Sequence, residues 1–275
     1  MFQNSYLSDS QDYLLTEEDI FLRSMLGSQL KKTVSYNLII AFDKIIVMKV
    51  SVVIPVYNEE KYIKNCLDSL MKQEEKPDEI IVIDNNCTDN TTNVVKKYKN
   101  IKVIRERKQG IIAARNAGFD HAQGNIIARC DADTILPVKW VKNIKQHFLE
   151  DELIVAISMP ILIHDIPGGN KFLLLFYLYM FIPRIIMGLY PLLGPSYAVK
   201  KSAWEKIKNE VCFDDNIVHE DIDLSFHIKK LGKIYHDKKT IVLTSGRRLK
   251  HNPLSFFGEY TLRFFKMLIS HRDLV

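Results

Sequence analysis

The chain has 275 residues, enough for one large α/β domain or two small ones with a sizeable buried core. Its 47% hydrophobic and 26% charged residues are ordinary for a soluble globular protein. The formal net charge of +5 suits anionic substrates or an anionic membrane surface. It is too small and too dispersed for a nucleic-acid-binding protein, so we expect no nucleic-acid partner.

The cysteines and the first residues indicate a cytoplasmic protein. Cys66, Cys87, Cys130 and Cys212 stand far apart, without the paired spacing of zinc or redox sites, and are expected to be reduced. The first 19 residues are polar and acidic and lack the basic start and apolar core of a secretory signal.

The first 47 residues differ in character from the rest of the chain. They contain a potential amphipathic helix at 20–30 and an apolar run at 38–42 that is too short to span a bilayer. We expect an N-terminal appendage over residues 1–47, or an over-extended reading frame, with a well-patterned domain starting at Met48.

From residue 50 onward, apolar runs alternate with amphipathic segments. The expected strands lie at 50–54, 79–83, 101–104 and 125–130. The expected helices lie at 59–73, 91–98, 110–122 and 137–148, with Asn58 as the N-cap of the first. Strands of nearly continuous apolar residues separated by helices predict a doubly wound, mainly parallel α/β sheet with helices on both faces, in a domain over 48–250.

Residues 172–193 are apolar and aromatic but are interrupted by Pro183, Arg184, Gly188 and Pro191. Three interpretations remain open: an interfacial helix pair dipping into lipid, which we favour, a buried core helix, and a true membrane span. The tail over 251–275 is an amphipathic helical stretch that docks on the same surface or packs on the core. We therefore expect peripheral association with the cytoplasmic face of a membrane.

Polar loops follow three of the expected strands. Residues 55–59 follow the first, residues 84–89 follow the second, and the acid pair Asp131 and Asp133 follows the fourth. In a parallel sheet these loops emerge at one edge, where α/β proteins bind ligands. An aromatic ring, a hydrogen-bonding acid and an acid pair can hold a base, a ribose and a metal-bound diphosphate. Because the chain has no glycine-rich phosphate loop, the cation must supply the anion site.

A further acidic motif covers residues 219–223 and opens an expected helix. Acids in a first helical turn are stabilised by the helix dipole, so ordinary capping would explain them. The same dipole keeps a carboxylate ionised, and an ionised carboxylate that faces a cleft can act as a general base.

Taken in order, these motifs resemble those of the inverting, nucleotide-sugar-dependent glycosyltransferases of family 2. The resemblance covers about residues 48–248. It is carried by Ser-Val-Val-Ile-Pro-Val-Tyr-Asn-Glu at 51–59, and by the stretches 84–91, 108–118, 131–133, 194–200 and 219–224. The second motif reads Asp-Asn-Asn-Cys-Thr-Asp where the family often has Asp-Gly-Ser, which weakens the transfer of its base contact.

The resemblance implies a GT-A fold and a nucleotide-sugar site built from residues 55–59, 84–85, 115 and 131–133. Tyr57 and Glu59 would contact the base and the ribose, and Asp84 the base. Asp131 would lie near the ribose and the metal, and Asp133 would ligate Mg²⁺ or Mn²⁺. The remaining donor-site residues are Pro55, Asn85 and Ala132, with Arg115 as a buttress of the nucleotide pocket.

On the acceptor side, the resemblance implies that Asp221 is the general base and that Glu220 positions the acceptor or the base. Gly194 would open a loop close to the donor sugar. Arg247 and Arg248 resemble a basic motif that neutralises a diphosphate.

The expected reaction is the transfer of a sugar, with inversion, from a nucleoside-diphosphate sugar to the hydroxyl of a glycan or lipid-linked acceptor. A UDP-sugar is favoured as donor, and cell-surface glycan or glycolipid synthesis as the setting. The metal would stabilise the leaving diphosphate, and a single base attacking in line inverts the anomeric carbon. Two alternatives remain: a catalytically silent, membrane-associated sugar-nucleotide-binding module, and a nucleotidyltransferase of related fold.

Overall fold

The computed structural model describes residues 48–166, 181, 184–186, 188, 190–215, 217–251 and 253–270. The chain divides into two compact units, Met1–Val47 and Met48–Val275. The first unit, with the helix expected at 20–30 and the apolar run at 38–42, lies outside the described residues. All of the described residues belong to the second unit.

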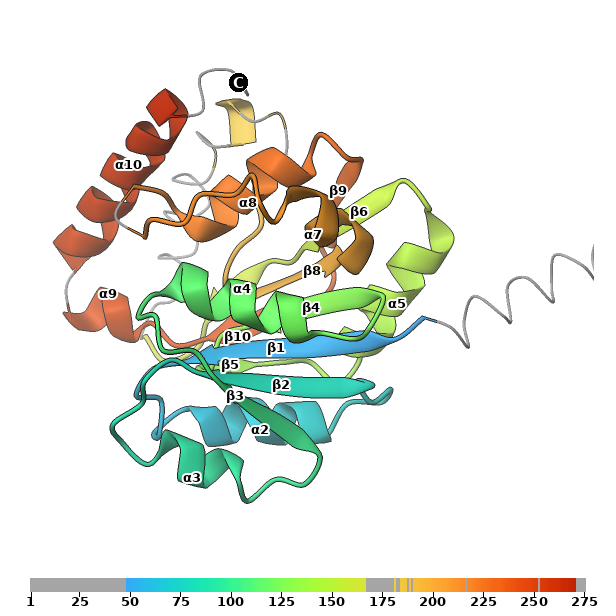
Figure 1. Cartoon of the computed structure of the whole chain (residues 1–275), viewed down its shortest axis with the longest axis vertical. Coiled ribbons are helices and arrows are strands. Elements are labelled where there is room, and N and C mark those ends of the chain that lie inside the picture. The colour runs from blue at the N-terminus through green and yellow to red at the C-terminus, as the bar shows by residue number, and fades with distance from the viewer. Residues whose placement is uncertain are drawn as a thin grey trace, which may run out of the picture. The chain divides into compact units, whose positions relative to one another are not determined.

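A seven-stranded sheet in the order β3-β2-β1-β4-β8-β6-β9 forms the centre of this unit (Figure 1). The strands β1 to β4 pair in parallel, as do β6 and β9, whereas β8 runs antiparallel to both β4 and β6. The mainly parallel sheet expected from the sequence is therefore confirmed. The strands are β1 (Val50–Val56), β2 (Glu79–Asp84), β3 (Ile101–Arg105), β4 (Ile126–Cys130), β6 (Ile154–Ser158), β8 (Ser196–Lys200) and β9 (Lys233–His236).

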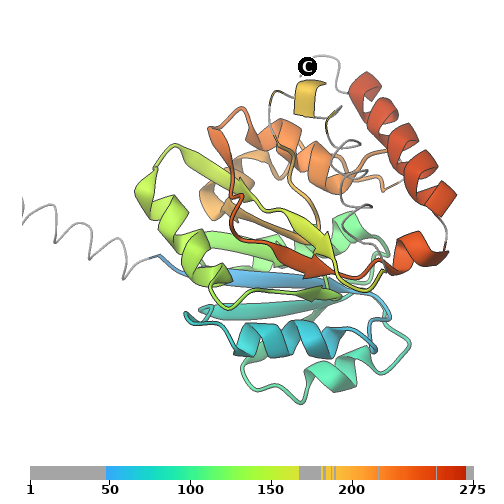
Figure 2. The same cartoon turned by 180° about the vertical axis from the view of Figure 1, so that it is seen from behind.

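Helices cover both faces of the sheet, because alternate side chains of each strand point to opposite sides. In β1, Val52 and Ile54 share a core cluster with α2 and α5, whereas Val53 belongs to a second cluster with α4, α7 and α8. Figure 1 shows α4 in front of the sheet, and Figure 2, from behind, shows the helices of the other face. The helices are α2 (Ile63–Met71), α3 (Thr91–Val95), α4 (Ile111–His121), α5 (Trp140–Glu150), α7 (Lys201–Ile207), α8 (Glu220–Ile228), α9 (Arg247–His251) and α10 (Pro253–Ser270).

A second, three-stranded sheet brings distant loops to the edge where β1 and β4 end. Its order is β5 (Thr134–Ile135), β10 (Val242–Thr244) and β7 (Ile161–Ile163). In it β10 runs antiparallel to β5, with Thr244 opposite Thr134. The residues that follow β10 therefore lie beside those that precede β5, which are Asp131 to Asp133.

The start of the first helix differs from the expectation. The helix begins at Ile63, with Tyr62 at its N-cap, so Asn58 as the cap is wrong. The backbone of Tyr62 instead donates to the Glu59 carbonyl at 3.0 Å, closing a separate turn before the helix. Asn58 adopts a left-handed backbone (φ 56°), and its Oδ1 accepts from the Thr88 amide at 2.8 Å. It therefore ties the loop after β1 to the loop after β2.

The two amphipathic segments of the sequence have different outcomes. Most of residues 172–193 lie outside the described part of the chain, so the three interpretations of that stretch stay open. The tail contains α10, an 18-residue helix. Among the helices that the structure describes, none combines the length and the apolar character needed to cross a membrane.

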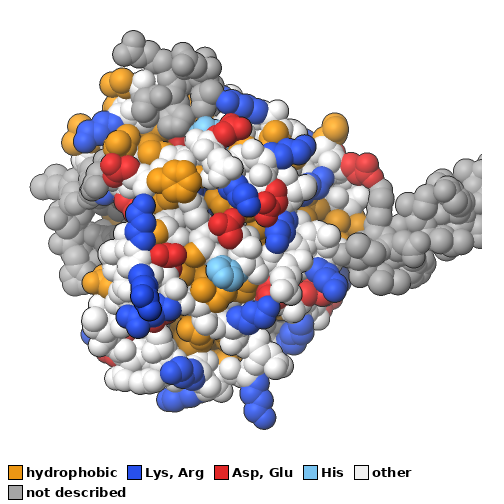
Figure 3. Space-filling view, viewed as in Figure 1, with side chains coloured by type: hydrophobic (Ala, Val, Ile, Leu, Met, Phe, Trp, Pro, Cys, Tyr) orange, Lys and Arg blue, Asp and Glu red, His pale blue; other side chains and the backbone are white. Residues whose placement is uncertain are grey.

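On the face seen in Figure 3, the positively charged side chains are spread out rather than gathered in one patch. Lys and Arg side chains are spread across this face, and Asp and Glu side chains stand between them. Opposite charges so interspersed give a weak field in front of this face, unlike the basic stripe typical of nucleic-acid-binding proteins.

Replacement of Gly118 by alanine should destabilise the fold, because this residue lets α4 approach β1 closely. A Cβ there would lie 2.2 Å from Val53 Cγ1 and 3.1 Å from Ile83 Cγ1. We expect Gly118→Ala to lower the free energy of unfolding by about 2 kcal/mol, measured by urea denaturation. Gly258→Ala in α10 is the control: a Cβ there has no neighbour within 4 Å, so the helix should gain about 0.5–1 kcal/mol. Equal effects of the two changes would contradict the close approach.

Candidate active site

A cavity of about 390 Å³ opens where the parallel strands end. The loops after β1 and β4 form one side of it, and the start of α8 and the segment before β8 form the other. The residues after β10 complete the wall. Residues that the sequence predicted for the site and that line the cavity are Pro55, Tyr57, Glu59, Asn85, Asp131, Ala132, Asp133, Gly194, Glu220, Asp221 and Arg247.

On the β1 side, one arginine holds two of the predicted acids. The Arg247 guanidinium donates from Nη2 to Glu59 Oε1 at 2.5 Å and lies with its Nε 3.1 Å from Asp133 Oδ2. It also stacks on Tyr62, with its Cζ 4.4 Å from the ring centroid. Burial opposes its charge, but the bond to Glu59 and the charge of Asp133 outweigh this and raise the Arg247 pKa. The side chain of Arg248 lies outside the described residues.

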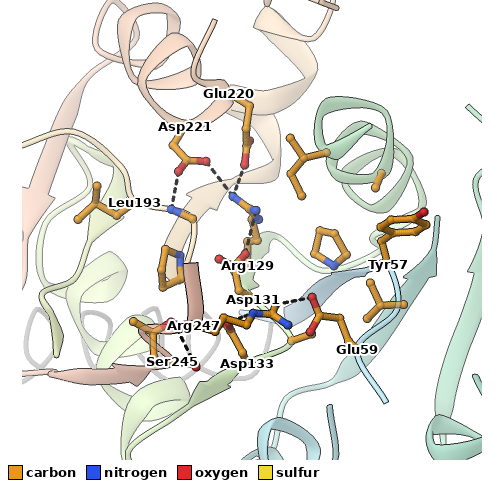
Figure 4. Close-up of a pocket in the computed structure, with 18 of the residues that line it drawn as sticks. Tyr57, Glu59, Arg129, Asp131, Asp133, Leu193, Glu220, Asp221, Ser245 and Arg247 are labelled. Carbon is orange, nitrogen blue, oxygen red and sulfur yellow. Dashed lines mark hydrogen bonds and ion pairs between the residues drawn. The ribbon is translucent and has the colours of Figure 1, made fainter. Parts of the chain in front are cut away.

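Tyr57 and Asn85 line the same cavity in different ways. The Tyr57 ring is 52% exposed and offers a free aromatic face at the cavity (Figure 4). The Asn85 side chain is buried and fully occupied: its amide donates to the carbonyls of Glu106 and Lys108 at 3.1 and 2.7 Å. Its Oδ1 accepts from the Gly110 amide at 2.9 Å. Asn85 therefore shapes the loop before α4 through contacts to the backbone.

Two predicted nucleotide contacts lie outside the wall of the cavity as the described residues form it. Asp84 Oδ1 accepts from the Cys87 amide at 2.8 Å, which closes the turn after β2. Arg115 is fully buried in α4, and its Nη1 lies 2.9 Å from the Glu220 carbonyl oxygen and 3.2 Å from Glu220 Oε2. It stacks over Trp204 at 5.7 Å. Arg115 thus contacts the acidic turn that opens α8.

Arg129 of β4 occupies the centre of the site, between two groups of acids (Figure 4). Its Nη2 donates to Asp131 Oδ1 at 2.9 Å, and its Nη1 donates to Asp221 Oδ1 at 2.8 Å and to Glu220 Oε1. The side chain is only 2% exposed. Burial opposes its charge, but Glu220 and Asp131 outweigh burial and raise the Arg129 pKa. The guanidinium therefore stays charged and neutralises acids on both sides of the cavity.

The two acids of the 220–221 pair differ in their electrostatics. Burial raises the pKa of Glu220 well above its usual range, against the attraction of Arg129 and with the added repulsion of Asp221. Burial also opposes the charge on Asp221, but a hydrogen bond with Glu220 and the charge of Arg129 outweigh it and lower the Asp221 pKa. Asp221 is consequently the carboxylate of the pair that is ionised at neutral pH, and its side chain is 17% exposed at the cavity.

Gly194 completes the surroundings of Asp221. Its amide donates to Asp221 Oδ2 at 2.6 Å. A Cβ here would lie 3.0 Å from Arg129 Nη1 and 3.1 Å from Asp221 Oδ2, closer than ordinary van der Waals contact, so a larger side chain would push on both groups. Since β8 runs antiparallel to β4, the segment just before β8 is brought to the edge where β4 ends. The two oxygens of Asp221 are thus held by two different elements.

Asp131 and Asp133 carry the oxygen ligands that a divalent cation prefers. Asp131 is 34% exposed, and Asp133 accepts from Thr244 Oγ1 at 3.4 Å in addition to its contact with Arg247. In the parts of the chain that the structure describes, no three His, Cys, Asp or Glu side chains are grouped to hold a metal ion by themselves. A Mg²⁺-type ion commonly uses one or two carboxylates and completes its shell with substrate phosphates and water. The pair fits such a shared ion.

Sequence reasoning missed Arg129, because it treated residues 125–130 as a uniformly apolar strand. A signal was present: a charged residue lies in the middle of a run that is otherwise buried on both sides of the sheet. Such a residue needs a charged partner, since burying an unpaired charge is costly. Acids that could serve as that partner follow directly, at Asp131 and Asp133.

The family model of glycosyl transferase family 2 matches residues 51–192, more than half of the chain. Glycosyltransferase GlyA of Streptococcus pneumoniae is 28% identical over 192 residues, which are 68% of this chain but only 24% of GlyA. This chain is therefore similar to about a quarter of that relative's length.

Solved structures share the architecture. The mannosyltransferase PcManGT of Pyrobaculum calidifontis, solved in complex with GDP-Man and Mn²⁺, has a TM-score of 0.61 at 20% identity, over 80% of this chain and 64% of that one. Residues 1–349 of S. aureus TarS, solved in complex with UDP-GlcNAc, have a TM-score of 0.53 at 24% identity, over 72% of this chain and 56% of that one. The expected GT-A fold is confirmed. Because the family model spans more than half of its sequence, the chain belongs to glycosyl transferase family 2.

Proposed function

We propose that this protein transfers a sugar, with inversion, from a nucleoside-diphosphate sugar to a hydroxyl group of an acceptor. One observation carries the proposal. An ionised carboxylate, Asp221, lines the same cavity as the acid pair Asp131 and Asp133. Displacement of a nucleoside diphosphate requires two parts, a base and a bound cation that stabilises the leaving diphosphate, and this cavity has residues for both.

The donor nucleotide would bind over the ends of β1 and β4. Tyr57 offers an exposed ring on which a base can stack, and Glu59 offers a carboxylate for the ribose hydroxyls. We propose a UDP-sugar as the first donor to test. TarS was solved with UDP-GlcNAc and PcManGT with GDP-Man, which supports the donor class and leaves both bases to be compared.

The leaving diphosphate would lie beside Asp131, Asp133 and Arg247. The two carboxylates would hold Mg²⁺ or Mn²⁺, a proposal supported by the Mn²⁺ bound to PcManGT. When bound, such an ion stabilises the negative charge of the departing diphosphate as a Lewis acid. Arg247 keeps its charge beside Asp133, so it can add a charge-assisted hydrogen bond to a phosphate oxygen.

Asp221 would remove the proton of the acceptor hydroxyl. Its Oδ1 is bound by Arg129 and its Oδ2 by Gly194, and each carboxylate oxygen has a second lone pair for a proton. Glu220 is 8% exposed and bound to Arg115 and Arg129, so it supports this arrangement rather than reaching the sugar. Of Glu220 and Asp221, only Asp221 is available to the substrate, and its proposed role is that of a base. With no second carboxylate of this pair to act as a nucleophile, we propose a single displacement, which inverts the anomeric carbon.

We further propose that the enzyme works at the cytoplasmic face of a membrane on a lipid-linked or glycan acceptor. Helix α10 has two apolar faces: Phe264 and Met267 are buried against the body, whereas Leu262, Phe265 and Ile269 are 51–63% exposed. Lys266 and Arg263 add positive charge beside this outer stripe, and Arg263 also lines the cavity. An apolar stripe flanked by cations suits an anionic bilayer, and it would bring lipid-linked acceptors to the cavity mouth.

Asp221→Asn should abolish turnover while leaving donor binding intact. We expect kcat for sugar transfer to fall about 1,000-fold, the effect of losing a general base. Binding of the UDP-sugar with Mn²⁺, measured by thermal stabilisation, should persist because ligands that bind the folded state raise its apparent stability. Asp133→Asn should instead impair donor binding, so that the Mn²⁺-dependent thermal stabilisation by UDP is lost.

Asp68→Asn, on the exposed side of α2 and paired there with Lys64, is the matched control and should keep wild-type turnover. A wild-type kcat in Asp221→Asn would contradict the assignment of Asp221 as the base. The products decide between enzyme classes: release of pyrophosphate would identify a nucleotidyltransferase, and donor binding without turnover by the wild type would identify a silent binding module.

Replacing Leu262, Phe265 and Ile269 together by glutamine should release the protein from lipid. We expect at least about 100-fold weaker binding to vesicles that contain anionic phospholipid, measured by flotation, because three side chains lose apolar burial. Leu153→Gln is the control, since Leu153 is 73% exposed at the start of β6, away from α10 in sequence and fold. Unchanged flotation of the triple variant would contradict a role for α10.

A further inference from the structure

We propose that Arg129 is the positioning residue that sets Asp221, the base, at a fixed distance from Asp131 on the donor side. This inference rests on the proposed function for the roles of the two acids. The contact itself is independent of that function: one guanidinium group joins a carboxylate on each side of the cavity.

The geometry of the guanidinium makes the link rigid. Nη1 donates to Asp221 Oδ1 at 2.8 Å, and Nη2 donates to Asp131 Oδ1 at 2.9 Å. Both nitrogens belong to one planar group with fixed directions for its N–H bonds. The separation of the two carboxylates is therefore limited by the width of that group, although the acids are 90 residues apart in sequence.

The guanidinium is itself held in place from several directions. It lies over the ring of Tyr197, 5.5 Å from the centroid, and Tyr197 stands directly opposite Arg129 in the β4–β8 pairing. The Glu220 carboxylate also binds Nη1 of Arg129. Glu220 is in turn held by Arg115, which contacts both its carboxylate and its backbone carbonyl. A side chain that is 2% exposed and so surrounded has little freedom to move.

Gly194 closes the arrangement from the cavity side. Its amide holds the second oxygen of Asp221 at 2.6 Å, and a Cβ at this position would press on Arg129 Nη1 at 3.0 Å. Asp221 is thus held at one oxygen by β4 and at the other by the segment before β8. The position of the base then depends on Arg129, which binds Asp221 Oδ1.

Lysine cannot replace this link, since an ammonium group is a point charge that cannot reach two carboxylates in a fixed plane. We expect Arg129→Lys to lower kcat for transfer about 100-fold, the cost of a base misplaced by about 1 Å. The dissociation constant of the donor with Mn²⁺, measured by calorimetry, should change little, because Asp131 and Asp133 both remain. Arg105→Lys, the same exchange at an exposed arginine at the end of β3 and outside the cavity wall, is the matched control, with wild-type kcat expected.

Gly194→Ala provides a second variant, which keeps every charge. Its added methyl group should also lower kcat while leaving the dissociation constant of the donor nearly unchanged. Chemical rescue adds a readout that a structural role would not produce: guanidinium chloride at non-denaturing concentration should restore part of the kcat of Arg129→Ala and none of that of Asp221→Asn. Wild-type kcat in Arg129→Lys, or a loss of donor binding in proportion to kcat, would overturn the proposal.

The link can also be tested without any turnover. In a double-mutant cycle on the urea unfolding free energy, Arg129→Lys should cost less in an Asp221→Asn background than in the wild type, because the two residues interact. Additive effects would overturn the contact. If the wild-type protein transfers no sugar but the cycle is non-additive, the proposed function is refuted. The link between Arg129 and Asp221 is then still established.

Discussion

The buried charge network around Arg129 is the constraint on which the site depends. One guanidinium in the central sheet contacts Glu220 and Asp221 on one side and Asp131 on the other. Breaking a buried pair by removing one partner typically costs about 3–5 kcal/mol, because a charge is left without compensation. The positions of β4, of the α8 N-terminus and of the loop after β4 are thus coupled through a single side chain.

Sheet topology explains how these groups meet. The loops after β1 and β4 lie at one edge because the strands are parallel, and the segment before β8 reaches the same edge because β8 is antiparallel to β4. The small sheet then brings Arg247 to Asp133, because β10 is antiparallel to β5. The cavity is therefore built from stretches of chain that lie far apart in sequence and are brought together by the strands and helices that flank them.

The acids of the site have different surroundings, and these assign different roles. Glu220 and Asp221 are neighbours in sequence and share the start of α8, yet the pKa of the first is raised and that of the second is lowered. The Glu220 pKa is raised because burial outweighs the attraction of Arg129 and Arg115. Burial also opposes the charge of Asp221, but there it is outweighed by the hydrogen bond with Glu220 and by the charge of Arg129. Arg115, expected at the nucleotide, supports this turn through Glu220.

The sequence alone determined the first four strands, β1 to β4, their parallel arrangement and the acids that gather at one edge, because β-branched runs and helical periodicity are local signals. It also determined the family, since the ordered motifs carry it. Only the tertiary structure decided that Asn58 joins two loops instead of capping a helix. The same holds for the Asn85 side chain, which hydrogen-bonds to backbone groups, and for Arg129 at the centre of the site. Those outcomes depend on partners from about 20 to 90 residues away, and no local pattern encodes a burial or a pairing of that range.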